Sequence, residues 1–120
     1  MEPVCSLSPD CHLKGKFSTI PNHKKPISTF LGVPYAQSPT GPLRFQPPQS
    51  ISLWQGVRDA TEYGAICPQN MEAAARSYAP FPVPENVSED CLFLNVWSPD
   101  IKGKLPIMVW IHGGAFMQGK

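Results

Sequence analysis

The sequence lacks long apolar runs, and it lacks an excess of charge of either sign. Its longest apolar run covers residues 107–111, far short of the roughly 20 residues that a membrane-spanning helix needs. Ten basic residues stand against nine acidic ones, so no basic block indicates nucleic acid and no acidic tail indicates a solvating segment. We therefore expect no membrane span and no nucleic-acid partner.

The first 16 residues lack both an apolar core segment and a cationic lead, so they do not have the pattern of a secretory signal peptide. They also contain few apolar residues and show no clear period. We predict that residues 1–16 form a disordered leader and that residues 17–120 form the folded part.

Helix-forming stretches are scarce, whereas proline is abundant. Of the 120 residues, 15 are proline, against a usual share of about 5%. Because proline fixes φ and removes a backbone donor, much of the chain must be turn and extended loop. Residues 37–49, with four prolines, predict a loop. Residues 71–79 are the best helix candidate, because Ala, Met, Glu and Arg favour helix.

Several short segments have the composition of strands. Runs of β-branched and aromatic residues bounded by Pro and Gly predict strands in 17–20 and 26–36. Residues 53–64 predict a turn followed by a short strand or one helical turn. The runs 91–98 and 105–112 are nearly continuously apolar, which is typical of strands buried on both faces. The chain offers too little helix to cover them, so we predict the opening of a larger α/β fold.

The tetrapeptide His112-Gly113-Gly114-Ala115 follows the last predicted strand. Its glycines allow the backbone to turn sharply and to approach a ligand closely. Two backbone N–H groups at such a turn can hold a developing negative charge. A structural turn after a core strand needs the same residues, so the tetrapeptide alone leaves both interpretations open.

The sequence also lacks the nucleophile that such a turn would serve. No serine stands in a Gly-x-Ser-x-Gly frame, the frame that places a nucleophilic Ser on a sharp strand-to-helix turn. The chain would therefore contain the electrostatic half of a hydrolytic site and none of its nucleophilic half. We predict no catalytic residue in this chain.

Residues 89–99, Glu-Asp-Cys-Leu-Phe-Leu-Asn-Val-Trp-Ser-Pro, resemble the second signature of the type-B carboxylesterase/cholinesterase family. The resemblance continues, in the family's order, through residues 30–49, 54–70 and 105–116. It implies the N-terminal portion of an α/β-hydrolase fold, with the leading strands and loops of an incomplete central sheet. It also implies a serine carboxylesterase that acts on small-molecule carboxylic esters without a cofactor.

The resemblance assigns roles at the glycine turn. The N–H groups of Gly114 and Ala115 would form the oxyanion hole, and Gly113 would give the turn its freedom. Ala115 stands where a third glycine is commoner in the family, and its Cβ narrows the pocket and restricts φ. Because the family's general base lies far downstream, His112 is implied to be structural.

Two cross-links are implied as well. The family joins two cysteines of these blocks in a disulfide, which implies a bond between Cys67 and Cys91; the alternative is two free thiols in a reducing compartment. An Arg of the "LRF" block meets a Glu of the "EDC" block in a buried salt bridge, which implies a structural pair of Arg44 and Glu89. The alternative is two solvated charges.

The loop between the two cysteines bears on compartment and substrate. Asn86-Val87-Ser88 is a glycosylation sequon. The sequon and the implied disulfide both indicate the endoplasmic reticulum or the cell exterior. The first 16 residues argue against this compartment, because they do not have the pattern of a signal peptide. The loop contains Tyr78 and Phe81 but no Trp. Since cholinesterases use a Trp of this loop to hold a quaternary ammonium group, its composition favours a general carboxylesterase.

Two further questions concern metal binding and loss of catalysis. Cys5 and Cys11, with His12 and His23, have a spacing that fits no common zinc site, so no metal is predicted. Some relatives use the same fold in cell adhesion, and the N-terminal motifs leave a non-catalytic binding module open. A truncated or spliced product without a stable fold is a third possibility.

Overall fold

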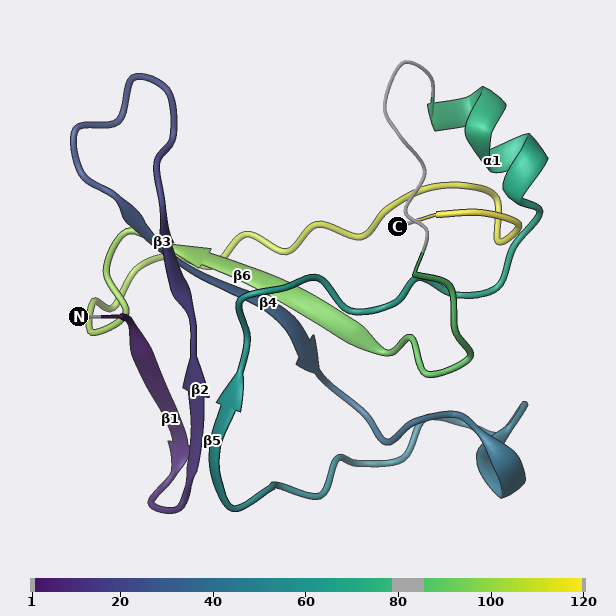
Figure 1. Ribbon diagram of the computed structural model, residues 1–120, viewed down its shortest axis with the longest axis horizontal. Helices are drawn as coiled ribbons and strands as arrows, with labels where there is room; N and C mark the ends of the chain where they lie inside the picture. Colours follow the sequence, from purple (N-terminus) through teal and green to yellow (C-terminus); the bar gives the residue numbers. More distant parts are fainter. Residues whose placement is uncertain (1, 79–85, 120) are drawn as a thin grey trace.

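The computed structural model describes residues 2–78 and 86–119. Within these residues the chain is rich in strands and contains little helix, and its strands form two small sheets (Figure 1). This architecture is compatible with part of an α/β-hydrolase. The elements, in chain order, are β1 (Val4–Ser8), β2 (Cys11–Lys14), β3 (Lys16–Ser18), β4 (Ile27–Pro34), the 3-10 helix η1 (Gly41–Leu43), β5 (Gly56–Asp59), α1 (Met71–Tyr78) and β6 (Phe93–Ser98).

The first sheet has the order β1-β2-β5 and includes the segment expected to be disordered. Strands β1 and β2 form an antiparallel hairpin, and β5 joins β2 in parallel. Cys11 and Leu13 of β2 are buried, at 0% and 4% exposure. The prediction of a disordered leader in residues 1–16 is therefore wrong. Strand β2 has only four residues and buries two alternate side chains. An alternation this short cannot be recognised from the sequence.

The second sheet is antiparallel, with the order β3-β4-β6. Its central strand β4 lies within the predicted span 26–36 and is the most buried strand. The β4–β6 register shifts between Phe30 and Val33, where Gly32 has a φ of 62° and donates its N–H to Asn95 Oδ1 at 3.0 Å. A Cβ on Gly32 would lie 2.7 Å from the Glu62 carbonyl oxygen, so this irregularity requires glycine.

Backbone hydrogen bonds join the two sheets. The N–H of Leu31 in β4 donates to the Ala60 oxygen at 2.8 Å, and the N–H of Ala60 donates to the Lys14 oxygen at 2.8 Å. The main buried cluster forms across this junction. It consists of Leu13, Phe30, Val33 and Ala60, with Cys5 and Trp54 packed against it.

The middle of the chain follows the predicted pattern closely. Residues 53–64 contain the short strand β5, and α1 covers all of the predicted helix 71–79 except Ala79, which lies outside the described residues. Asn70 caps α1, because its Oδ1 accepts the N–H of Ala73 at 3.0 Å. Residues 37–49 are irregular apart from η1.

The two apolar segments near the end of the chain are exposed rather than buried. Strand β6 forms, but Leu94, Val96 and Trp97 are 41–52% exposed. Residues 105–112 form no helix or strand and have no ladder partner among the described residues, and Ile107 and Met108 are 90% and 96% exposed. Both predictions of burial on two faces are therefore wrong, as is the prediction of a second strand. An apolar run indicates what needs cover, and neither sheet nor α1 supplies that cover here (Figure 1).

A search of the described residues finds no helix with the length and apolar character that a bilayer crossing requires.

Candidate functional site at a glycine turn

The tetrapeptide singled out in the sequence leads into a tight turn. Gly114, Ala115 and Phe116 all have positive φ, at 117°, 52° and 60°. The turn is closed by two hydrogen bonds to the Gly114 carbonyl oxygen, from Met117 N–H at 3.0 Å and from Gln118 N–H at 3.2 Å. Because a peptide unit is planar, the bonds that hold the Gly114 oxygen also fix the direction of the Ala115 N–H.

The turn presents two adjacent backbone donors. Among the described residues no acceptor lies within hydrogen-bonding distance of the Gly114 or the Ala115 N–H. Gly114 is half-buried and Ala115 is exposed. Such donors need a partner from solvent or from a ligand.

The two glycines of the turn have different roles. A Cβ on Gly114 would fall 1.7 Å from the backbone oxygen of Gln118, so the turn cannot keep its shape with any other residue there. A Cβ on Gly113 would meet no atom within 4 Å. Ala115, the departure from the commoner glycine, adopts a left-handed conformation that costs an L-residue about 1–2 kcal/mol.

His112 lies at the entrance of the turn. Its Nδ1–H donates to the Gly113 oxygen at 2.7 Å, and its exposed ring lies against the Cα of Gly119. These contacts tie the beginning of the turn to its end. The structural role implied for His112 stays a prediction.

Arg44 and Glu89 come together as a salt bridge, with Arg44 Nε 2.5 Å from Glu89 Oε1. The side chains are 54% and 43% exposed, so the expectation of a buried pair is wrong. The Arg44 guanidinium also lies over the Phe45 ring, 4.8 Å from its centroid. The pair connects the proline-rich loop to the segment that precedes β6. An exposed ion pair of this kind contributes about 0–1 kcal/mol to the free energy of unfolding.

Cys67 and Cys91 are free thiols, so the predicted disulfide is not formed in this structure. The segments near them are nevertheless paired, because Ile66 exchanges two backbone hydrogen bonds with Asn86 and Ser88. Cys67 is exposed and Cys91 is half-buried. The resemblance implies which two cysteines would pair, and it does not determine whether they are oxidised.

Cys91 should react slowly with an alkylating reagent. Burial raises the pKa of the Cys91 thiol, and the negative charges of Cys67, Asp90 and Glu89 raise it further. Only the thiolate reacts, so alkylation of Cys91 by iodoacetamide should accelerate up to a pH above the ordinary titration range of cysteine. Peptide mass spectrometry over a pH series would measure this rate. A Cys91 midpoint at or below that of an unfolded peptide would contradict the prediction.

The remaining predictions in this region have mixed outcomes. Asn86 is exposed, as a glycosylated residue must be. Phe81 lies outside the described residues, and Tyr78 is described only as the last residue of α1.

Gln69, which no sequence motif indicates, contacts the end of the glycine turn. Its Nε2 donates to the Gly119 oxygen at 3.0 Å, and its Oε1 accepts the Gly119 N–H at 3.1 Å. Figure 1 shows the yellow C-terminal segment beside α1, which begins two residues after Gln69. The two residues are 50 positions apart, and no local pattern could connect them.

A serine and a histidine also meet elsewhere in the molecule. Ser6 Oγ lies 2.9 Å from His12 Nδ1, across the exposed β1–β2 hairpin. A nucleophilic serine needs oxyanion donors beside it. The hairpin and the glycine turn lie at opposite sides of the molecule (Figure 1), so this pair does not complete the site.

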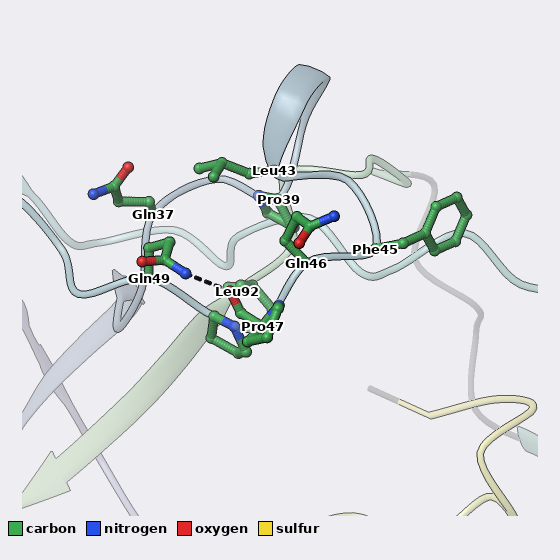
Figure 2. A pocket seen from close by; sticks show the side chains of 9 residues that line it. Gln37, Pro39, Leu43, Phe45, Gln46, Pro47, Gln49 and Leu92 are labelled. Carbon is green, nitrogen blue, oxygen red and sulfur yellow. Dashed lines mark hydrogen bonds between the residues drawn. The ribbon is translucent and has the colours of Figure 1, made fainter.

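The proline-rich loop encloses a shallow pocket of about 230 Å³ (Figure 2). Its walls are mainly proline, leucine and glutamine side chains, and one dashed bond in Figure 2 joins Gln49 to the Pro47 oxygen at 3.0 Å. The lining residues are Gln37, Pro39, Leu43, Phe45, Gln46, Pro47, Pro48, Gln49 and Leu92. None of them belongs to the glycine turn, so this pocket is separate from the candidate site.

The strand-rich architecture and the glycine turn with two available N–H groups are compatible with part of an α/β-hydrolase. The sequence profile of the Carboxylesterase family matches residues 3–120, and the chain belongs to this family. The match includes most of the segment predicted to be a leader, in keeping with the β1–β2 hairpin found there. The boundary at residue 17 is therefore not a family boundary.

Individual relatives support the same assignment. Liver carboxylesterase 1 of Mus musculus is 42% identical over an alignment 125 residues long. The alignment covers 93% of this chain and 22% of the relative. Para-nitrobenzyl esterase of Bacillus subtilis (strain 168) is 51% identical over 94 residues, covering 78% and 19%. Acylcarnitine hydrolase of Mus musculus is 41% identical over 118 residues, covering 89% and 20%. The chain thus spans about a fifth of the length of the curated relatives it matches.

Proposed function

We propose that the full-length protein containing this chain is a serine carboxylesterase that hydrolyses small-molecule carboxylic esters. In this proposal Gly114 and Ala115 donate their N–H groups to the oxyanion, and the positive φ of Gly114 shapes the turn. The observation that carries the proposal is the pair of adjacent N–H groups without an acceptor among the described residues, in a member of an esterase family.

The chemistry follows from where charge develops. A serine Oγ outside this chain attacks the ester carbonyl carbon, and its proton passes to a histidine base. The carbonyl oxygen becomes negatively charged, and the two N–H groups stabilise it more strongly than they stabilise the neutral ester. The intermediate collapses, the alcohol leaves with the proton, and water then releases the acid from the acyl-enzyme.

Residues 1–120 supply the oxyanion donors and not the nucleophile. The sequence contains no Gly-x-Ser-x-Gly frame, which is the frame that positions the serine in enzymes of this fold. We therefore propose that the 120-residue chain by itself hydrolyses no ester above background.

The proposal also covers substrate class and compartment. The names of relatives include a para-nitrobenzyl esterase and an acylcarnitine hydrolase, which favours a small ester over a protein or nucleic-acid substrate for this chain. The exposed Asn86 of the sequon favours the secretory pathway.

The direct test uses the full-length protein with a simple aryl ester. We expect turnover that an organophosphate directed at serine abolishes, with one phosphoryl group bound for each active site. The control is the 120-residue chain, which should neither turn over the ester nor bind the organophosphate. A full-length protein that has an intact Gly-x-Ser-x-Gly frame and still shows neither property would contradict the proposal and favour a binding role.

A further inference from the structure

Gln69 holds the end of the glycine turn through both polar atoms of its side chain. Besides its two hydrogen bonds to the backbone of Gly119, its Nε2 donates to the Cys67 oxygen at 3.2 Å. Both hydrogens of the amide nitrogen and the amide oxygen therefore have partners. An amide with this set of partners has a single orientation, because a flip would oppose oxygen to oxygen.

The backbone around Gln69 is itself restrained. Pro68 precedes it and has a fixed φ, and Asn70 follows it as the cap of α1. The backbone of Gln69 therefore has a defined position from which its side chain reaches Gly119.

The restraint on Gly119 reaches the two proposed oxyanion donors through short connections. Gln118, the neighbour of Gly119, donates its N–H to the Gly114 oxygen. That oxygen belongs to the same planar peptide unit as the Ala115 N–H. Gly119 also lies directly against the His112 ring, since a Cβ on Gly119 would fall 2.0 Å from His112 Cε1. Residues 112–119 thus form a loop whose two ends meet, and Gln69 fixes the meeting point.

We infer that Gln69 is a positioning residue of the esterase site: its side-chain amide fixes Gly119 and thereby aims the N–H groups of Gly114 and Ala115. The inference rests on the proposed function. Gln69 touches no reacting atom, so its loss should misdirect the oxyanion donors without removing a substrate contact. Transition-state stabilisation depends on donor geometry more steeply than ground-state binding does.

The test uses two variants of the full-length protein, Gln69→Ala and Gln69→Met. Methionine nearly preserves the volume and length of glutamine and lacks all three hydrogen bonds, so it separates bonding from packing. The matched control is Gln37→Ala, because Gln37 Nε2 also donates to a backbone oxygen, that of Ser50, at 3.0 Å. Gln37 lies in the proline-rich loop, away from the turn.

Three quantities are measured: kcat and KM for an aryl ester, inhibition by an aryl trifluoromethyl ketone, and amide hydrogen exchange of residues 112–119. Both Gln69 variants should lower kcat by roughly tenfold to a hundredfold and leave KM within about twofold. The inhibition constant of the ketone, which forms an oxyanion in the site, should rise by the same factor as kcat falls. Exchange at Gly119 should become faster, and Gln37→Ala should change none of the three.

The contrary outcomes are separate for the two proposals. An unchanged kcat in both Gln69 variants overturns the inference, as does a fall in kcat with no change in ketone inhibition or an equal fall in Gln37→Ala. If the unsubstituted full-length protein hydrolyses no ester, the proposed function fails. Exchange then still decides whether Gln69 clamps the turn, because an unchanged rate at Gly119 would show that it does not.

Discussion

Replacement of Gly114 by Ala in the full-length protein should lower kcat for an aryl ester by a factor on the order of 10²–10³, the loss seen when one oxyanion donor is removed. Gly114 has a φ of 117°, and an added Cβ would lie 1.7 Å from the Gln118 backbone oxygen. A backbone atom cannot move aside as a flexible side chain can. The turn must therefore open, and both proposed donors change direction while the ester-binding surface remains.

A matched control for Gly114→Ala is Gly41→Ala. Gly41 also has a positive φ, 54°, but a Cβ there would meet no atom within 4 Å. It lies in η1, below the C-terminal segment in Figure 1 and separated from it. This variant should cost about 1–2 kcal/mol of stability through strain and leave kcat and KM unchanged. Equal kcat losses in the two variants would show that strain alone, and not the position of the donors, explains the effect.

The candidate site illustrates what the sequence can and cannot predict. Two adjacent glycines after an apolar segment predicted the turn, because few residues other than glycine permit such a backbone. The resemblance assigned the freedom of the turn to Gly113, whereas in the structure it is Gly114 that has a positive φ and that the Gln118 oxygen makes irreplaceable. Gln69 carried no signal at all, because its function depends on a contact with Gly119, 50 positions away.

The fold shows the same division between local and long-range information. The helix at α1 was predicted from composition, and β4 from its β-branched and aromatic residues. The strand pairing of β2 with β5 was not, because parallel partners lie far apart in the chain and each strand has only four residues. Burial on both faces was predicted for residues 91–98 and 105–112, which are exposed in the structure. An apolar composition shows that a segment needs other elements to cover it, but it does not show whether they do.

The largest expected effect on the 120-residue chain concerns that missing cover. We expect this chain, expressed by itself, to associate as its concentration increases and to show no cooperative thermal transition. Ile107, Val109 and Ile111 stand at alternate positions of a segment that forms no helix or strand, and they are 76–90% exposed. The segment has no ladder partner among the described residues, and an unpaired, exposed apolar segment can bind other chains.

Substitution of Ile107, Val109 and Ile111 by Lys should keep the chain monomeric in sedimentation velocity experiments at concentrations where the unsubstituted chain has associated. Charges at alternate positions block edge pairing. The matched control replaces three scattered exposed residues by Lys: Phe45, Leu53 and Tyr63, which are 90%, 51% and 64% exposed. Both variants gain the same charge. A difference in association between them therefore reports the contribution of residues 107–111 and not general charge repulsion. If the control also stays monomeric, or if the unsubstituted chain is a monomer with a sharp transition, then residues 107–111 do not drive association.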